Sequence, residues 1–205
     1  AAETLVAVDH VECLAENLRE ISNVFKLGAL GDQALATHSR MPDIVKQAAL
    51  SVGQLFERAI AAGKIRIEDL FDDRHQPIAN TRPQKFKTRF DDFTDQNVAP
   101  LQESVLEQCK WAVYAICIDR NCYVPTHNRK FSQPLTGDEK VDFVNNRTKR
   151  IFDDPVGKRT GTHEQPFLLQ TYRRDTGEVM HDISAPITVK GRHWGGFRIG
   201  YKTEV

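Results

Sequence analysis

The spacing of apolar residues changes twice along the chain and divides it into three parts. In residues 3–26 the apolar positions are alternately three and four residues apart, which predicts one helix with a coiled-coil seam. Because the pattern is short, it fits the end of a longer coiled coil and an amphipathic helix lying on the domain nearly equally well. Gly28 and Gly31 are expected to end this helix and to form a linker. The seam residues are Val11, Leu14, Leu18, Ile21 and Phe25.

The second part, residues 41–108, has the 3.6-residue spacing of helices, with interruptions. Pro42 is expected in the first turn of the first helix, and Gly63 is expected to close that helix. The stretch 74–83 predicts a loop, and 85–108 predicts a further helical segment. The aspartates of this part lack the alternate spacing and the central glycine of a calcium-binding loop, so we interpret them as a solvated helix face. They are Asp69, Asp72, Asp73, Asp91 and Asp92.

The third part, residues 111–203, changes to a period of two. Residues 111–119 are apolar on both faces and predict a buried strand, and 141–154 predict a helix. Three strands follow, joined by hairpin turns at 175–178 and 190–192. This order predicts an α+β fold with helices packed on one face of an antiparallel sheet.

Composition excludes several classes of function. Lys plus Arg and Asp plus Glu number 28 each, so no net charge attracts the chain to nucleic acid or to an anionic membrane. Hydrophobic residues make up 40% of the chain, which is normal for a globular protein and too many for a disordered one. No apolar run approaches the roughly 20 residues that cross a bilayer, and no signal-peptide pattern opens the sequence. We therefore expect a cytoplasmic domain with no nucleic acid partner, and the same pattern fits a domain excised from a larger protein that is anchored in a membrane elsewhere.

The cysteines and histidines do not form a local metal-binding motif. There is no CxxC pair, and Cys117 and Cys122 are expected to point to opposite faces at the end of one strand. Unpatterned cysteines fit reduced thiols better than metal ligands or disulfides. A metal site would require histidines to converge in the folded protein, so no cofactor is predicted. The residues are Cys13, Cys109, Cys117 and Cys122, with His127, His163, His181 and His193.

Catalytic motifs are absent from the sequence as well. His163 and Glu164 are not part of an HExxH motif, and there is no GxSxG, P-loop or GxGxxG pattern. Cysteine–histidine pairs arise easily by chance, so a cysteine-dependent hydrolase is the least favoured alternative. We expect a binding or sensing protein rather than an enzyme.

One arginine falls on a helix face that is expected to be packed. At 100° per residue, Arg147 lies between Phe143 and Ile151 on the side that covers the sheet. Its guanidinium either faces a partner or a cavity, where five donors suit a carboxylate, or its stem packs while its head reaches water. Both interpretations stay open. The loop 120–138 is interpreted as the wall and lid of a ligand pocket.

Four motifs together resemble the C-terminal sensor region of some bacterial methyl-accepting chemotaxis proteins. The resemblance covers residues 40–203, and the stretch VDHVECLAENLREISNVFKLG resembles the end of the signalling helix that leads into such a sensor. The motifs, in the family's order, are DRNCYVPTHNRKFSQPLTGD, NNRTKRIFDDPVG, PFLLQTYRRDTGEVMHDISAPI and GRHWGGFRIGY.

The resemblance implies a PAS/Cache-like antiparallel sheet that follows the signalling coiled coil. Residues 1–30 would be the end of that coiled coil with its linker, and 31–205 the sensor domain. Within the sensor, 41–108 would form a helical layer and 109–205 the sheet core. The resemblance also implies a non-catalytic, cytoplasmic ligand sensor that dimerises through its N-terminal helices. It would reach a histidine kinase and an adaptor only through a signalling region that this chain lacks.

The family does not fix one ligand, so the candidate residues are taken from the motif positions. Their cationic bias favours a small ligand that carries a carboxylate. Two alternatives stay open: a metal- or haem-dependent redox or gas sensor that uses His127 or His181 with Cys122, and a protein-interaction module without a ligand. The candidate ligand-binding residues are Tyr123, His127, Asn128, Arg129, Arg147, Arg150, Tyr172, His181 and Asp182.

Overall fold

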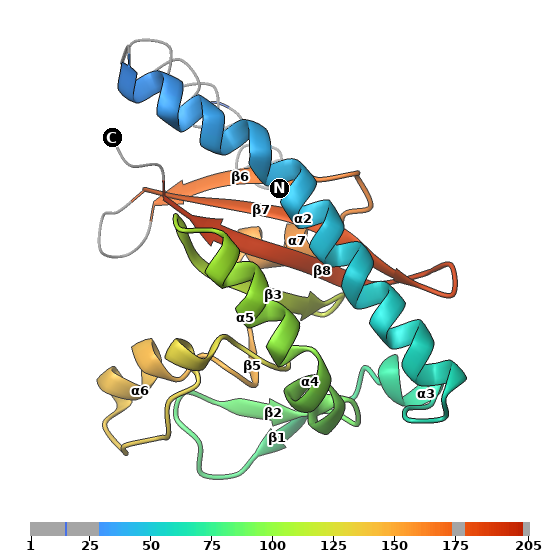
Figure 1. Ribbon diagram of the computed structural model, residues 1–205. Helices are drawn as coiled ribbons and strands as arrows, with labels where there is room; N and C mark the ends of the chain where they lie inside the picture. The colour runs from blue at the N-terminus through green and yellow to red at the C-terminus, as the bar shows by residue number, and fades with distance from the viewer. Residues whose placement is uncertain (1–14, 16–28, 174–178, 203–205) are drawn as a thin grey trace, which may run out of the picture.

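A four-stranded antiparallel sheet forms the centre of the computed structural model, which describes residues 15, 29–173 and 179–202 (Figure 1). The strands are adjacent in the order β3-β8-β7-β6, so the last of them along the chain lies between the first and the third. The expected α+β fold, with an antiparallel sheet and a long helix before it, is confirmed. The strands are β3 (Ala112–Asp119), β6 (Leu168–Arg173), β7 (Val179–Val189) and β8 (Arg192–Tyr201).

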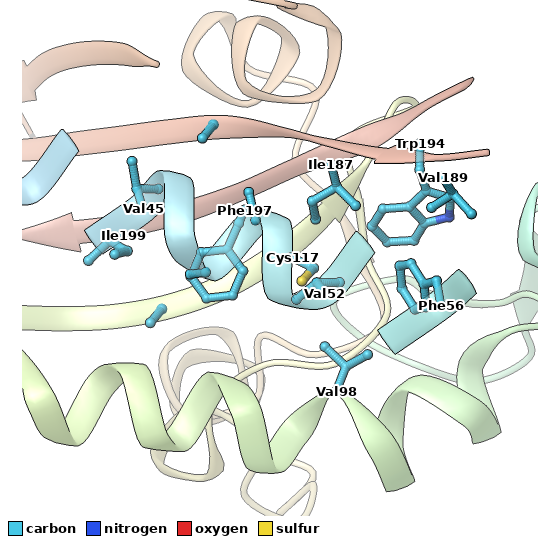
Figure 2. Close-up of a cluster of buried hydrophobic side chains, with 14 of the residues drawn as sticks. Val45, Val52, Phe56, Val98, Cys117, Ile187, Val189, Trp194, Phe197 and Ile199 are labelled. Carbon is cyan, nitrogen blue, oxygen red and sulfur yellow. The ribbon is translucent and has the colours of Figure 1, made fainter. Parts of the chain in front are cut away.

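The long helix α2 (Ala29–Ala61) lies across one face of the sheet (Figure 1). Its residues Val45, Val52 and Phe56 are fully buried at helical spacing. They pack with strand residues such as Phe197 in the main hydrophobic core (Figure 2). Burial of this apolar stripe against the sheet is what stabilises so long a helix.

The N-terminal part of α2 differs from the prediction at two positions. Gly31 lies inside the helix rather than in a linker, and Pro42 lies inside it rather than in its first turn. The helix continues through Pro42, and Met41, the residue before it, is buried in the core. The predicted coiled-coil seam lies outside the described residues.

Short elements connect α2 to the first strand of the central sheet. The stretch 74–83, predicted as a loop, contains β1, and 85–108, predicted as helical, begins with β2, which pairs with β1. Most of the rest of 85–108 is helical, as predicted, with a break at Val98 between α4 and α5, and Pro100 lies in the first turn of α5. The elements are α3 (Ile67–Leu70), β1 (Gln76–Ile78), β2 (Lys85–Lys87), α4 (Asp91–Asn97) and α5 (Ala99–Gln108).

The prediction of one helix over 141–154 is wrong. The helix α6 ends at Asn145, and Phe143, expected to cover the sheet, is 45% exposed. Beyond it the backbone of β5 forms a two-stranded sheet with β4, so its N–H and C=O groups are not available for a helix. The elements of this region are β4 (Tyr123–Val124), the 3-10 turn η1 (Arg129–Phe131), α6 (Glu139–Asn145) and β5 (Arg150–Ile151).

A helix that the sequence pattern did not predict, α7 (Pro155–Thr162), packs on the sheet face opposite α2 (Figure 1). Asp154 begins it, because its side chain accepts the backbone N–H groups of Val156 and Gly157. The contact is close: a Cβ on Gly196 of β8 would lie 2.6 Å from the Thr160 carbonyl oxygen. Helices therefore cover both faces of the sheet and not one face as predicted.

The predicted hairpin turn at 190–192 is confirmed. Lys190 and Gly191 both have positive φ, at 51° and 74°, as a two-residue turn between twisted strands requires. Gly195 lies where β3 approaches β8 closely, because a Cβ there would lie 2.1 Å from the Ile118 carbonyl oxygen. The other predicted turn, at 175–178, lies outside the described residues.

Candidate functional site

The sheet face that α7 covers carries a row of polar side chains. Tyr114 of β3, Gly200 of β8, Asp182 of β7 and Gln170 of β6 are successive cross-strand neighbours. Because Gly200 has no side chain, the Tyr114 ring lies across it and its hydroxyl reaches Asp182. The row exists because side chains alternate along β7, with Asp182 on this face and His181 on the face toward α2.

Asp182 is the centre of a buried ion pair. Its Oδ2 accepts hydrogen bonds from Arg198 Nε at 2.9 Å, from Arg198 Nη2 at 2.7 Å and from the Tyr114 hydroxyl at 2.5 Å. Burial alone would lower the pKa of Arg198, but the Asp182 carboxylate raises it, so the guanidinium stays charged. Arg198 is therefore the partner that neutralises the buried carboxylate of Asp182.

Two further arginines lie beside one aromatic ring. The guanidinium carbons of Arg147 and Arg150 are 5.3 Å and 5.0 Å from the centre of the Phe152 ring. Arg150 also lies 4.6 Å from the Phe143 ring, and its Nη1 donates to the Phe143 carbonyl oxygen at 3.1 Å. Burial and then the charge of Arg147 lower the pKa of Arg150 to about 10. Arg150 is thus a buried guanidinium held between two rings.

His127 lies among these positive charges. Its ring meets the rings of Tyr114 and Phe131 edge-on, and its Nδ1 accepts the backbone N–H of Asn128 at 2.9 Å. Burial and then the nearby cations lower the pKa of His127 far below its ordinary value, so the imidazole is neutral. The cations are Arg147, Arg198, Lys130 and Arg150. The region around His127 therefore has a positive potential that suits an anion.

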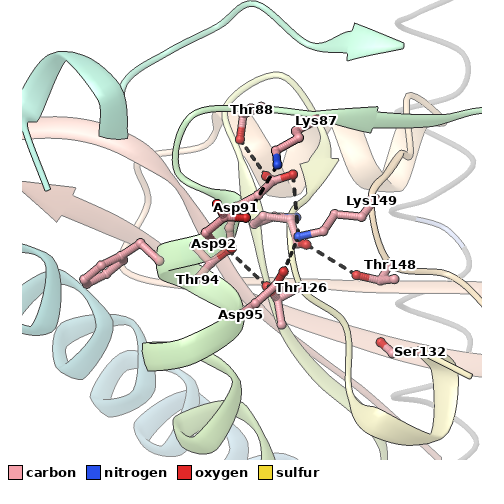
Figure 3. Close-up of polar contacts among 12 residues, drawn as sticks. Lys87, Thr88, Asp91, Asp92, Thr94, Asp95, Thr126, Ser132, Thr148 and Lys149 are labelled. Carbon is pink, nitrogen blue, oxygen red and sulfur yellow. Dashed lines mark hydrogen bonds and ion pairs between the residues drawn. The ribbon is translucent and has the colours of Figure 1, made fainter. Parts of the chain in front are cut away.

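An open cavity of about 400 Å³ is also lined by His127. Lys149 lies along its wall, with Nζ 2.7 Å from Asp95 and 3.5 Å from Asp91 (Figure 3). Thr126 donates to Asp95 at 2.5 Å, which fixes that carboxylate. The loop 120–138 thus supplies a wall of a cavity. The lining residues are Asp95, Ala99, Pro100, Thr126, His127, Arg129, Ser132, Thr148 and Lys149.

Some of the nine predicted residues lie together in the folded protein. His127, Arg147 and Arg150 form one group, and Asp182 is joined to it through Tyr114. Arg129 lines the open cavity. Tyr172 lies on the same strand face as Gln170, close enough to Arg198 to help raise the pKa of that guanidinium.

The other predicted residues lie in different surroundings. The Tyr123 hydroxyl is 2.9 Å from both the Phe86 carbonyl oxygen and Asp91 Oδ2, inside the main core. The Asn128 side chain accepts the Ala115 backbone N–H at 2.8 Å and joins the loop to β3. His181 faces α2, away from the polar row. Arg147 does not cover the sheet from a helix, because α6 ends before it.

Three residues on this polar face of the sheet were not among the predicted site residues: Tyr114, Gln170 and Arg198. The signal for Arg198 is its alternation with Gly196 and Gly200, which places one charge between two positions without side chains on the same strand face. Tyr114 and Gln170 give no such local signal, because their importance depends on pairing with distant strands.

Cys109, Cys117 and Cys122 are buried free thiols. Burial raises the pKa of Cys122 to about 11, with Asp119 adding to the effect. Within the described ranges, no group of three or more His, Cys, Asp or Glu residues is arranged to hold a metal ion. None of the helices in this part of the chain is long and apolar enough to span a bilayer.

Comparison with known proteins finds one distant structural similarity and no sequence match. No protein-family model and no curated protein matches the chain. Among solved structures, the chain is similar to an extracellular ligand binding receptor from Desulfohalobium retbaense DSM5692, with 16% identity and a TM-score of 0.35. The match covers 79% of this chain and 25% of the receptor chain, so this chain spans about a quarter of that receptor. A likeness at this level carries no argument about function.

Proposed function

We propose that the chain is the ligand-sensing domain of a bacterial chemoreceptor and binds a small molecule that carries a carboxylate. The proposal rests first on the four sequence motifs that resemble chemoreceptor sensor regions. The structural observation that supports it is Arg150, a buried guanidinium beside the second arginine Arg147.

A buried charge is expected to have a partner of opposite charge. Arg150 is 9% exposed, and the hydrogen bond it makes among the described residues goes to the carbonyl oxygen of Phe143. No carboxylate pairs with it in that part of the chain. The rings of Phe143 and Phe152 contact the guanidinium and leave donors at its edge for a carboxylate.

Positive charges act on Arg150 and on His127 in this region. Arg198 is paired with Asp182. Besides burial, the charge of Arg147 lowers the pKa of Arg150, and the charges of both arginines lower the pKa of His127. An anionic ligand would relieve this repulsion, and binding energy would come from charge-assisted hydrogen bonds in a buried setting.

In this proposal the domain is not an enzyme and stays in the cytoplasm. It forms a homodimer through its N-terminal helices, and its ligand changes how those helices meet the sheet. A histidine kinase and an adaptor receive the signal through the signalling region of a larger receptor.

Isothermal titration calorimetry with acetate, propionate, succinate and glutarate tests the ligand class. We expect at least one acid to bind the wild-type protein and to bind Arg150→Gln at least tenfold more weakly. Arg147→Ala is also expected to bind the same acid more weakly than the wild type does. Arg58→Gln, which removes an exposed arginine from the end of α2, serves as the matched control and should bind as the wild type does.

Arg150→Lys separates charge from geometry, because it keeps the positive charge but loses the bidentate fork. It should bind the acid with intermediate affinity. Equal affinity of the wild type and Arg150→Gln for every acid that binds, or no binding of any acid, would overturn the proposal.

A further inference from the structure

Three ring side chains from three different elements meet where α2 crosses the sheet. The rings of His38 of α2 and His181 of β7 lie edge-on with their centres 4.6 Å apart, and the Tyr201 ring of β8 lies 5.6 Å and 5.3 Å from them. His38 Nδ1 is 2.8 Å from the Tyr201 hydroxyl, and His181 Nδ1 is 3.0 Å from Thr171 Oγ1 of β6. The cluster therefore joins the helix to three neighbouring strands.

The segment of α2 that carries His38 has few contacts with the rest of the domain. Between residues 35 and 40, Thr37 is buried and His38 is half-buried, and the others are exposed. Pro42 weakens the helix at this point, because a proline has no N–H to donate to the carbonyl oxygen of residue 38. From Met41 onward the helix is held in the main core. The segment before Met41 can therefore leave the sheet while the core stays intact.

Both histidines of the cluster are neutral at neutral pH. Burial lowers the pKa of His38, and burial and then the charge of His38 lower the pKa of His181 to about 4. Burial also raises the pKa of Tyr201, so its hydroxyl stays protonated. The other titratable groups at this junction are Arg40 of α2, Cys109 after α5 and Asp182, which lies on the opposite face of β7.

Protons oppose this arrangement of α2 on the sheet. Two imidazolium rings at this distance would repel one another, and both charges would lie away from bulk water. In a released helix both rings would be hydrated and would regain a pKa near 6.5. A group whose pKa is lowered in the closed form takes up a proton on release, so release becomes more favourable as the pH falls below 6.5.

We propose that His38, His181 and Tyr201 form a proton-sensitive latch, which holds the segment of α2 before Met41 against the sheet at neutral pH and releases it in acid. The latch goes beyond the proposed ligand site, because that site lies on the other face of the sheet. It gives the domain a second input, whichever molecule binds there.

Hydrogen–deuterium exchange of the whole chain, followed by mass spectrometry at pH 5, 6 and 7, tests the latch. Protection is corrected for the intrinsic effect of pH on exchange. We expect peptides from 33–41 to be less protected than peptides from β7 and β8 at every pH, which is the mark of local release. Their protection should fall at least about tenfold from pH 7 to pH 5, because release lets His181 take up nearly one proton in this range.

Histidine variants assign this fall to the latch. His181→Gln should reduce the fall at least threefold. His38→Gln should reduce it as well, and it carries the comparison if His181→Gln does not fold. His163→Gln is the matched control, because burial and then the charge of His193 lower the pKa of His163 to about 4 as well, but its Nε2 lies 2.9 Å from Ser184 Oγ, away from α2. It should leave the fall in 33–41 unchanged.

Three outcomes would overturn the latch. Equal protection of 33–41 and β7 at every pH would show that this segment opens only when the whole domain unfolds. Protection of 33–41 that is the same at pH 5 and pH 7 would show that protons do not release it. A fall that is unchanged in both His38→Gln and His181→Gln would assign the effect to other groups. None of these outcomes affects the acid site, which calorimetry with Arg150→Gln tests separately.

Discussion

His181 and Asp182 are consecutive residues of β7 that point to opposite faces of the sheet. Asp182 pairs with Arg198 on the face covered by α7, and the His181 ring meets His38 of α2 at 4.6 Å on the other face. One strand therefore connects the candidate ligand site to the long N-terminal helix. A shift of β7 on ligand binding would change the contact between β7 and α2. A ligand could in this way favour one of two arrangements of α2 on the sheet.

The contact between α2 and the sheet contains a polar link that can be tested. His38 Nδ1 lies 2.8 Å from the Tyr201 hydroxyl, across 163 residues of sequence. We expect Tyr201→Phe to lower the free energy of unfolding by about 0.5–1.5 kcal/mol, the usual net value of one hydrogen bond. Urea denaturation followed by circular dichroism measures it. Tyr172→Phe, on the other face, is the control, and an equal loss in both variants would argue against a specific link.

The buried histidine on the α2 side predicts loss of stability in acid. Burial and then the proximity of His38 lower the pKa of His181 to about 4, below its ordinary value of 6.5. A group whose pKa is lowered by folding contributes stability above pH 6.5, and this contribution is lost as the pH falls from 6.5 toward 4. The loss amounts to at most about 3 kcal/mol.

Denaturation curves at half-unit pH steps between pH 4 and 7 measure this loss. His181→Gln should show a shallower dependence of the free energy of unfolding on pH than the wild type. A wild-type curve that is flat over this range, or identical slopes in both proteins, would show that His181 does not titrate in this way.

His75 predicts a pH dependence of the opposite sign. Its Nε2 lies 2.9 Å from Asp119 Oδ2; burial lowers its pKa, but the hydrogen bond and charge of Asp119 outweigh burial and raise it. A group whose pKa is raised by folding contributes stability below the unfolded pKa of 6.5, and that contribution is lost as the pH rises through the folded pKa. His75→Gln should therefore lose most stability relative to the wild type near pH 6 and least near pH 9. A constant difference across this range would contradict the ion pair.

Gly195 predicts a steric effect inside the sheet. A Cβ at this position would lie 2.1 Å from the backbone oxygen of Ile118, which cannot move without disturbing β3. Gly195→Ala should lower the free energy of unfolding by about 1–3 kcal/mol through overpacking. Gly63→Ala provides a comparison, because nothing lies within 4 Å there and only its φ of +67° opposes the substitution. If thermal unfolding shows Gly195→Ala to be as stable as the wild type, the close strand contact is wrong.

Local patterns predicted those parts of the fold that depend on local physics. Residues 111–119, apolar on both faces, predicted a buried strand, and in the structure Cys117 lies in the main core and Ile118 in a second cluster. Gly191 marked the hairpin because a positive φ is needed there whatever the rest of the chain does.

The wrong predictions concern segments whose backbone conformation depends on pairing with residues far away in the sequence. The apolar spacing of 141–154 suits a helix, but residues 150–151 form β5, which pairs with β4 instead. The candidate site shows the same limit. Asp182 was taken from a motif position in the sequence, while Arg198 gains its role only through the register of β7 with β8.

Native mass spectrometry tests the central claim most directly, with a visible absorption spectrum of the same sample. The wild-type protein, as purified and after incubation with the acids, should carry one small acid-bearing molecule per chain. Arg150→Gln should lose that adduct while Arg58→Gln keeps it. An adduct that persists equally in Arg150→Gln, or a zinc adduct or a Soret band in place of an acid, would contradict the account and make a metal- or haem-dependent sensor the better explanation.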